Sequence, residues 1–173
     1  KRQEALTPTS GTHGAFIVEM LEKNSPYYKE MRSNLNKIAE SNFAAIVQSI
    51  EPIYGKAPKS KLHATLAHMM INDCILFSAA PRIFAFTLIY VGAISYFHIT
   101  ISPEAGAALL EQLVDEFSKY FEDVGKNDRV CKNLLLLFVH LYNFQLINSG
   151  LIFDLIRLLL NKCKSCLLVR TRS

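Results

Sequence analysis

The stretch "LLLLFVHLYNFQLINSGLIFDLIRLLL", residues 134–160, decides between two fold classes. It is apolar enough to suggest membrane helices, but His140, Asn143 and Asp154 interrupt it. The Asn-Ser-Gly sequence at 148–150 divides it, and the part before this break is shorter than the roughly 20 apolar residues that cross a bilayer. The stretch therefore favours two helices that pack their apolar faces inside a protein.

The same helical pattern extends over most of the chain. Apolar residues recur at steps of three and four at Phe43, Ile46, Val47, Ile50 and Tyr54, and again at Leu110, Leu113, Val114, Phe117 and Phe121. Each set forms one apolar stripe along a helix, and strand-like alternation is hard to find. We predict helices over residues 15–23, 27–39, 42–54, 60–77, 82–98, 103–122, 129–147 and 150–161.

Short connectors make neighbouring helices antiparallel, so the helices from residue 27 onward fall into pairs. The pairs start roughly 33 to 43 residues apart, close to the period of about 40 in HEAT-type repeats. We predict an all-α fold of stacked antiparallel helix pairs, a HEAT-like α-solenoid that is truncated after about three and a half repeats. A last unpaired helix would expose an apolar face that favours self-association.

Composition fits one globular domain. Half of the 173 residues are apolar, a fifth are charged, and the net charge is +4. We predict a flexible leader over 1–14, the helical domain over 15–161, and a basic, disordered tail over 162–173. The modest charge is not typical of a nucleic-acid-binding face.

One segment keeps a membrane alternative open. Residues 83–101 carry no formal charge and approach the length of a membrane span, which would make the chain a helical integral membrane protein. Amphipathic, charged helices on both sides of this segment favour a water-facing exterior instead. A central helix of a stacked repeat is covered on several sides and can be apolar all round.

Residues with catalytic or metal-binding chemistry do not form a recognisable site. Cys163 and Cys166 have the spacing of half a zinc site but lack a second pair of ligands, so we expect no metal. Cys74 and Cys131 fit small core residues, and the histidines fit core or helix-end positions with satisfied hydrogen bonds. We expect no catalytic residue, no cofactor and no enzymatic activity.

Two motifs resemble a known family. "LNKIAESNF", residues 35–43, resembles the first helical hairpin of middle domains of the initiation factor 4G type. "HLYNFQLINSGLIFDLIRLL", residues 140–159, is similar to the nucleolar branch of that superfamily. The motif residues that we assign to the structural core of the family are Asn42, Phe43, His140, Leu141, Tyr142, Asn143, Phe144, Phe153 and Asp154. From the residues themselves, Asn143 can bridge two helices and Asp154 can pair with Arg157.

The resemblance implies a non-catalytic adaptor for a DEAD-box RNA-dependent ATPase of the initiation factor 4A class. It implies a place in the nucleolus of the nucleus, in ribosomal RNA processing and small-subunit biogenesis, and it points to Asn36 and Lys37 as ATPase contacts. The plain alternative is that Asn36 caps a turn and Lys37 is solvated. A splicing or translation adaptor of the same superfamily is the alternative function.

RNA binding is a further alternative for the basic residues Lys56, Lys59, Lys61, Arg170 and Arg172. We prefer to interpret them as a solvated turn and a solvated terminus, because phosphate binding usually needs a broader basic surface.

Overall fold

The computed structural model describes residues 19–77, 83–123 and 125–170, and the side chains among them as far as residue 162. Within these ranges the chain forms helices and no strand, which confirms the all-α class. The helices are α1 (Pro26–Lys37), η1 (Glu40–Asn42), α2 (Phe43–Ile50), η2 (Glu51–Gly55), α3 (Lys59–Leu76), α4 (Ile83–Thr100), α5 (Glu104–Glu122), α6 (Asp128–Asn143) and α7 (Ser149–Arg170). The two η elements are short 3-10 helices.

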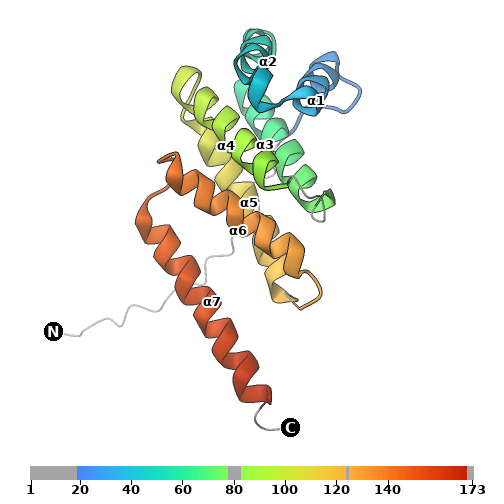
Figure 1. Cartoon of the computed structure of the whole chain (residues 1–173). Coiled ribbons are helices and arrows are strands. Elements are labelled where there is room, and N and C mark those ends of the chain that lie inside the picture. The colour runs from blue at the N-terminus through green and yellow to red at the C-terminus, as the bar shows by residue number, and fades with distance from the viewer. Residues whose placement is uncertain (1–18, 78–82, 124, 171–173) are drawn as a thin grey trace, which may run out of the picture.

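The helices stack as pairs, in two layers (Figure 1). The first helices of the pairs pack on one another, α1 on α3 and α3 on α5, and the second helices do the same, α2 on α4 and α4 on α6. This arrangement of three pairs followed by α7 is the predicted HEAT-like solenoid. Stacking buries the apolar faces of the helix pairs, which a single amphipathic pair cannot bury alone.

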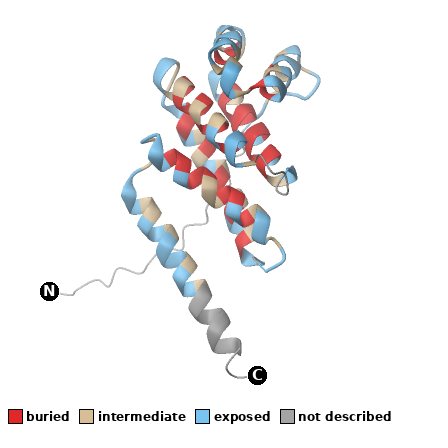
Figure 2. Cartoon of the chain, viewed as in Figure 1, coloured by how far each residue is buried: buried red, intermediate tan, exposed pale blue. Residues whose placement is uncertain are grey.

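The core lies between the two layers, where Figure 2 shows most of the buried residues of α3 to α6. Its largest fully buried side chains include Phe97, Phe138, Leu109, Leu113 and Ile94. Aromatic rings pack edge to face in it, with the Phe117 and Phe138 centroids 5.7 Å apart. Cys74 and Cys131 are buried free thiols, as predicted, and burial raises the pKa of Cys74 to about 12.

Helix α4 is, among the described residues, the one helix long and apolar enough to cross a membrane. In this fold its C-terminal half is a core element, with Val91, Ile94 and Phe97 buried among the neighbouring helices. Its tyrosines make polar contacts within the protein, since the Tyr96 hydroxyl donates to Glu51 Oε2 at 3.0 Å. The apolar residues in the C-terminal half of α4 therefore pack against other helices of the protein.

Two predicted helix ends differ from the structure for identifiable reasons. The helix predicted over 42–54 ends as an α-helix at Ile50 and continues as η2, because Pro52 has no N–H to donate and crowds the carbonyl of the preceding turn. The helix predicted over 129–147 ends at Asn143. There Gln145 has a φ of 60°, its N–H donates to Tyr142, and the N–H of Leu146 donates to Leu141. This is a Schellman cap with glutamine in the position that glycine usually holds, so no sequence signal marked it.

The ends of the described chain also differ from expectation. Residues 19–22 have no regular structure, so the helix predicted over 15–23 is wrong there, and the predicted leader lies outside the described residues. Helix α7 runs on to Arg170, through most of the segment predicted to be a disordered tail. Lys162 joins α7 to the end of α5, since its Nζ donates to the Glu122 carbonyl at 3.2 Å and lies 5.6 Å from the Phe121 ring centroid.

Candidate partner-binding groove

The turn between α1 and α2 is held by one side chain. Asn42 accepts a hydrogen bond from the Ala39 N–H through Oδ1 at 2.7 Å and donates through Nδ2 to the Lys37 carbonyl at 2.8 Å. It thereby satisfies backbone groups at the end of α1 and at the start of η1. Ile38 is buried and anchors the turn to the core. The sequence assigned Asn42 a structural role, and its bonds are of that kind.

Asn36 and Lys37 present their side chains at the outer surface of this turn. Both residues are exposed, and within the described part of the chain neither side chain has a hydrogen bond or ion pair. The plain alternative, that Asn36 caps the turn, is wrong, because Asn42 does so. These two polar groups are therefore accessible to a partner.

The N-terminal half of α4 adds an apolar surface beside the turn. Phe86 is 37% exposed and Leu88 40%, and both line hollows beside the turn. Phe84, which is 59% exposed, packs on His140 of α6 instead. We expected α4 to be covered on several sides, and over this half that expectation is wrong, because the first helix pair covers only part of it. Phenylalanine side chains exposed in this way mark surfaces that contact other molecules.

The turn and α4 enclose a continuous groove of three adjoining hollows. The middle hollow, about 750 Å³, runs between residues 36–41 of the turn and Ala85, Phe86 and Ile89 of α4. It shares Phe86 with a hollow of about 320 Å³ and Glu40 with one of about 400 Å³. We call this surface the α1–α4 groove, and Asn36 and Lys37 lie at its edge.

The two sequence motifs meet at the far end of this groove. A Cβ added at Gly92 would lie 3.6 Å from the Phe43 ring and 3.7 Å from the Phe144 ring, so both rings lie over the same glycine. Phe43 belongs to the first motif and Phe144 to the second. Both line the hollow of about 400 Å³ with Leu88 and Ile89. Residues 101 positions apart in the sequence thus shape one surface.

The second motif divides between core and surface. Leu141 and His140 are buried, as assigned. The side chains of the other motif residues are exposed, so the structural role assigned to them is not burial in the core: Tyr142, Asn143, Phe144, Phe153 and Asp154. Asp154 does pair with Arg157, at 2.9 Å. The interhelical bridge predicted for Asn143 is made instead by Asn133, whose amide donates to the Cys74 carbonyl at 3.2 Å.

Two buried histidines lack the hydrogen bonds that we predicted for them. Neither ring nitrogen of His63 or His140 has a hydrogen-bond partner among the described residues. His140 lies against Phe84, with ring centroids 5.3 Å apart, and His63 against Tyr54 at 5.1 Å. Burial lowers the pKa of both imidazoles, and near His63 the charge of Glu104 opposes this while that of Lys59 adds to it. The folded protein therefore holds them in the neutral form.

This burial predicts a pH dependence of stability. Below about pH 6.5 the unfolded chain binds protons that the buried imidazoles resist, so the free energy of unfolding should fall as the pH falls. The loss approaches ~1.4 kcal/mol per pH unit for each histidine until its lowered pKa is reached. Urea unfolding between pH 8 and pH 5 measures it. His140→Gln should reduce the slope of the free energy of unfolding against pH, and a slope equal to that of the wild type would contradict the assignment.

Other candidate residues of the sequence lie apart from the groove. Lys61 pairs with Glu19 at 2.7 Å, and Lys56 and Lys59 are exposed. The side chains of Cys163, Cys166 and Arg170, and all of Arg172, lie outside the described part. No group of three or more metal-ligating side chains is found among the described residues.

The stacked pairs and the locked first hairpin define the class of this protein, an all-helical repeat protein of the HEAT type. Relatives named as nucleolar MIF4G-domain proteins support membership of that family. It is 31% identical over 132 residues to human nucleolar MIF4G domain-containing protein 1, and 26% identical over 136 residues to suppressor of glycerol defect protein 1 of Schizosaccharomyces pombe. The Saccharomyces cerevisiae protein of the latter name is 24% identical over 144 residues.

These matches cover about three quarters of this chain but only a small part of each relative. The aligned region is 76% of this chain and 15% of the human protein, and for the S. pombe protein the shares are 76% and 17%. For the S. cerevisiae protein they are 75% and 15%. No family model matches the chain, and no solved structure matches it.

Proposed function

We propose that this chain is a non-catalytic scaffold that binds a DEAD-box RNA-dependent ATPase of the initiation factor 4A class through the α1–α4 groove. Its process would be nucleolar: pre-rRNA processing and biogenesis of the small ribosomal subunit. The observation that carries the proposal is the presence of two exposed, unpaired polar residues, Asn36 and Lys37, at the edge of an apolar groove.

The chemistry of the groove supports a protein partner. Its walls are mainly aromatic and aliphatic, with Glu40 and Ser41 also in the lining. A lysine and an asparagine stand at its edge, and this combination is typical of the centre and the rim of protein interfaces. Lys37 can reach an acidic side chain or a carbonyl, and Asn36 can both donate and accept. The name of the human and mouse relatives places those proteins in the nucleolus.

Binding of this kind would regulate the ATPase by changing its conformational equilibrium. A scaffold that binds one relative arrangement of the two ATPase lobes better than another raises the population of that arrangement. The effect on ATP turnover is limited by the difference between the two affinities. The scaffold needs no catalytic group for this.

Purified chain tested against a panel of initiation factor 4A paralogues decides the proposal. We expect one paralogue to bind and its RNA-stimulated ATP hydrolysis to change when the chain is added. Binding only to a splicing or a translation paralogue would favour the alternative adaptor function. Binding to none of the panel would refute the proposal.

We also propose that the exposed face of α7 associates with a second copy of the chain. Phe153 is 58% exposed and Leu160 56%, on a helix that packs mainly on α6. Sedimentation velocity should then show association that increases with concentration and is lost in Phe153→Lys/Leu160→Lys. Arg157→Gln on the same helix serves as a control and should behave like the wild type. A monomer at all concentrations would contradict this proposal.

A further inference from the structure

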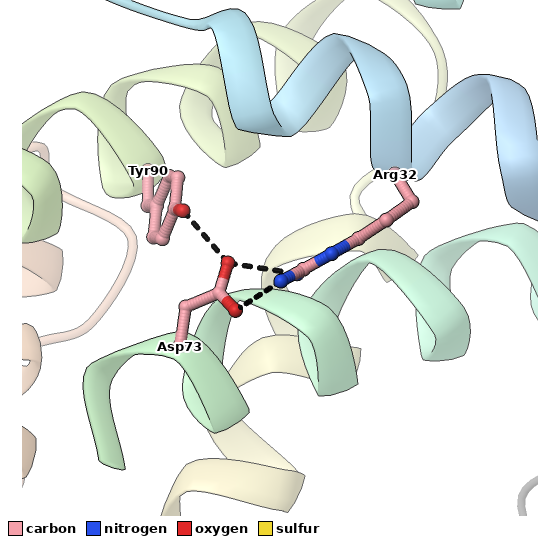
Figure 3. A network of polar contacts seen from close by, with 3 residues as sticks. All are labelled: Arg32, Asp73 and Tyr90. Atoms are coloured by element: carbon pink, nitrogen blue, oxygen red, sulfur yellow. Dashed lines mark hydrogen bonds and ion pairs between the residues drawn. The ribbon is translucent and has the colours of Figure 1, made fainter. Parts of the chain in front are cut away.

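A polar network that the sequence did not reveal joins three helices beside the groove (Figure 3). The Arg32 guanidinium of α1 makes a two-pronged contact with the Asp73 carboxylate of α3, with Nη1 2.8 Å from Oδ2 and Nη2 2.7 Å from Oδ1. The Tyr90 hydroxyl of α4 donates to the same Oδ2 at 2.9 Å. The Asp73 side chain is 6% exposed and that of Arg32 30%.

The protonation states of Arg32 and Tyr90 suit this geometry. The hydrogen bond that Arg32 donates to Asp73 raises the pKa of Arg32, which remains a cation. Burial, together with the nearby Asp73 charge, raises the pKa of Tyr90, so its hydroxyl keeps the proton that it donates. The contact between Nη1 and Oδ2 is a charge-assisted hydrogen bond, whereas the contact between Nη2 and Oδ1 is an ion pair without hydrogen-bond geometry. Together the two contacts restrict the position of the guanidinium. Asp73 therefore sets the position of α1 relative to both α3 and α4.

The network also lies next to the residues proposed to bind the partner. Arg32 is four residues before Asn36 on α1, so the two side chains project from the same face of the helix. Asp73 and Tyr90 line the hollow of about 320 Å³ that Leu35 and Asn36 also line. A shift of α1 about Asp73 would move Asn36 and Lys37 relative to Phe86 and change the width of the groove.

We propose that Arg32, Asp73 and Tyr90 are positioning residues, which hold the first hairpin at the spacing from α4 that the partner requires. This inference rests on the proposed function, because the partner is the ATPase of that proposal. Tyr90 is 5% exposed and its hydroxyl is bonded to Asp73, so we assign it the role of holding Asp73 and, through it, α1. Replacing a buried ion pair by apolar residues of similar size is often neutral for stability, which allows positioning to be separated from folding.

The test compares the wild type with Arg32→Met/Asp73→Leu and with Tyr90→Phe, using two measurements. Amide exchange at Ile38, Ala39 and Asn42, whose N–H groups are bonded within the turn, reports the position of the hairpin without any partner. We expect exchange there to become about tenfold faster in the double variant, with little change in α5 and α6. Affinity for the ATPase should fall about tenfold, since a less preorganised surface binds more weakly. Tyr90→Phe should move both readouts in the same direction by a smaller factor.

Leu134→Ala, in the core of α6, is the control for a general loss of stability. If it reproduces both effects of the double variant, the network is merely structural and the inference is overturned. Unchanged affinity in the double variant, with a wild type that binds, overturns it also. If the wild type binds no ATPase, the proposed function fails, and the exchange measurement alone decides: local acceleration at the turn supports positioning, and unchanged exchange refutes it.

Discussion

The double variant Asn36→Ala/Lys37→Glu is expected to bind the ATPase about 30-fold more weakly than the wild type, a loss of roughly 2 kcal/mol. Both side chains are exposed and make no hydrogen bond or ion pair within the described part of the chain. The fold should be retained, with a loss of at most about 1 kcal/mol of stability because Lys37 lies in the last turn of α1, where a cation suits the helix dipole. The loss of affinity should therefore come from the contacts with the partner. Isothermal titration with the bound paralogue measures the affinity, and circular dichroism verifies the fold.

A control with the same change of charge is available on the same chain. Lys56 is exposed and does not line the α1–α4 groove. Lys56→Glu should leave the affinity within about twofold of the wild type at physiological salt, because distant surface charges are largely screened. If Lys56→Glu weakened binding as much as the double variant, a general attraction by charge, and no contact at the turn, would explain the loss. Unchanged binding by the double variant would refute the contact directly.

Phe138→Ala is expected to lower the free energy of unfolding by about 3–5 kcal/mol, a large fraction of the 5–15 kcal/mol typical of a domain. Phe138 is 1% exposed, and its ring packs edge to face on Phe117. Its removal would enlarge a hollow of about 260 Å³ that already lies between α5, α6 and α7. Urea denaturation followed by far-ultraviolet circular dichroism measures the change.

The neighbouring residue provides the comparison. Val139 is 47% exposed on the same helix, and Val139→Ala should change stability by no more than about 0.5 kcal/mol. Similar losses for both variants would mean that α6 does not face the core in the way described. If Phe138→Ala lowered the free energy of unfolding but left the affinity for the ATPase unchanged, the groove would also be shown to be separate from this part of the core.

Most of the helices could be predicted because their signals are local. The step of three and four residues marked the apolar faces, and Pro103 with Glu104 marked the start of α5. The failures fall where a local signal was missing or misinterpreted. Gln145 adopts a backbone conformation that glycine favours, so the end of α6 was placed too late. At the end of α2 the signal is Pro52, which converts the last turn to a 3-10 helix.

The candidate site was predicted only in its polar part. Asn36, Lys37 and Asn42 lie in one short motif, and family resemblance was enough to select them. The apolar wall of the groove was missed because α4 is apolar on every side, and no periodic pattern tells which side is covered. Exposure of Phe86 and Leu88 depends on how far the first helix pair reaches across α4.

The amino-acid sequence by itself determined the helical class and the positions of most helices, because the apolar pattern of a helix depends on residues within one or two turns of each other. Tertiary structure alone decided that the rings of Phe43 and Phe144 meet over Gly92. It also decided that Arg32 and Tyr90 both donate to the buried carboxylate of Asp73. These contacts join residues up to 101 positions apart. Their geometry follows from how successive pairs stack, which is set by the packing of whole faces and not by any local pattern.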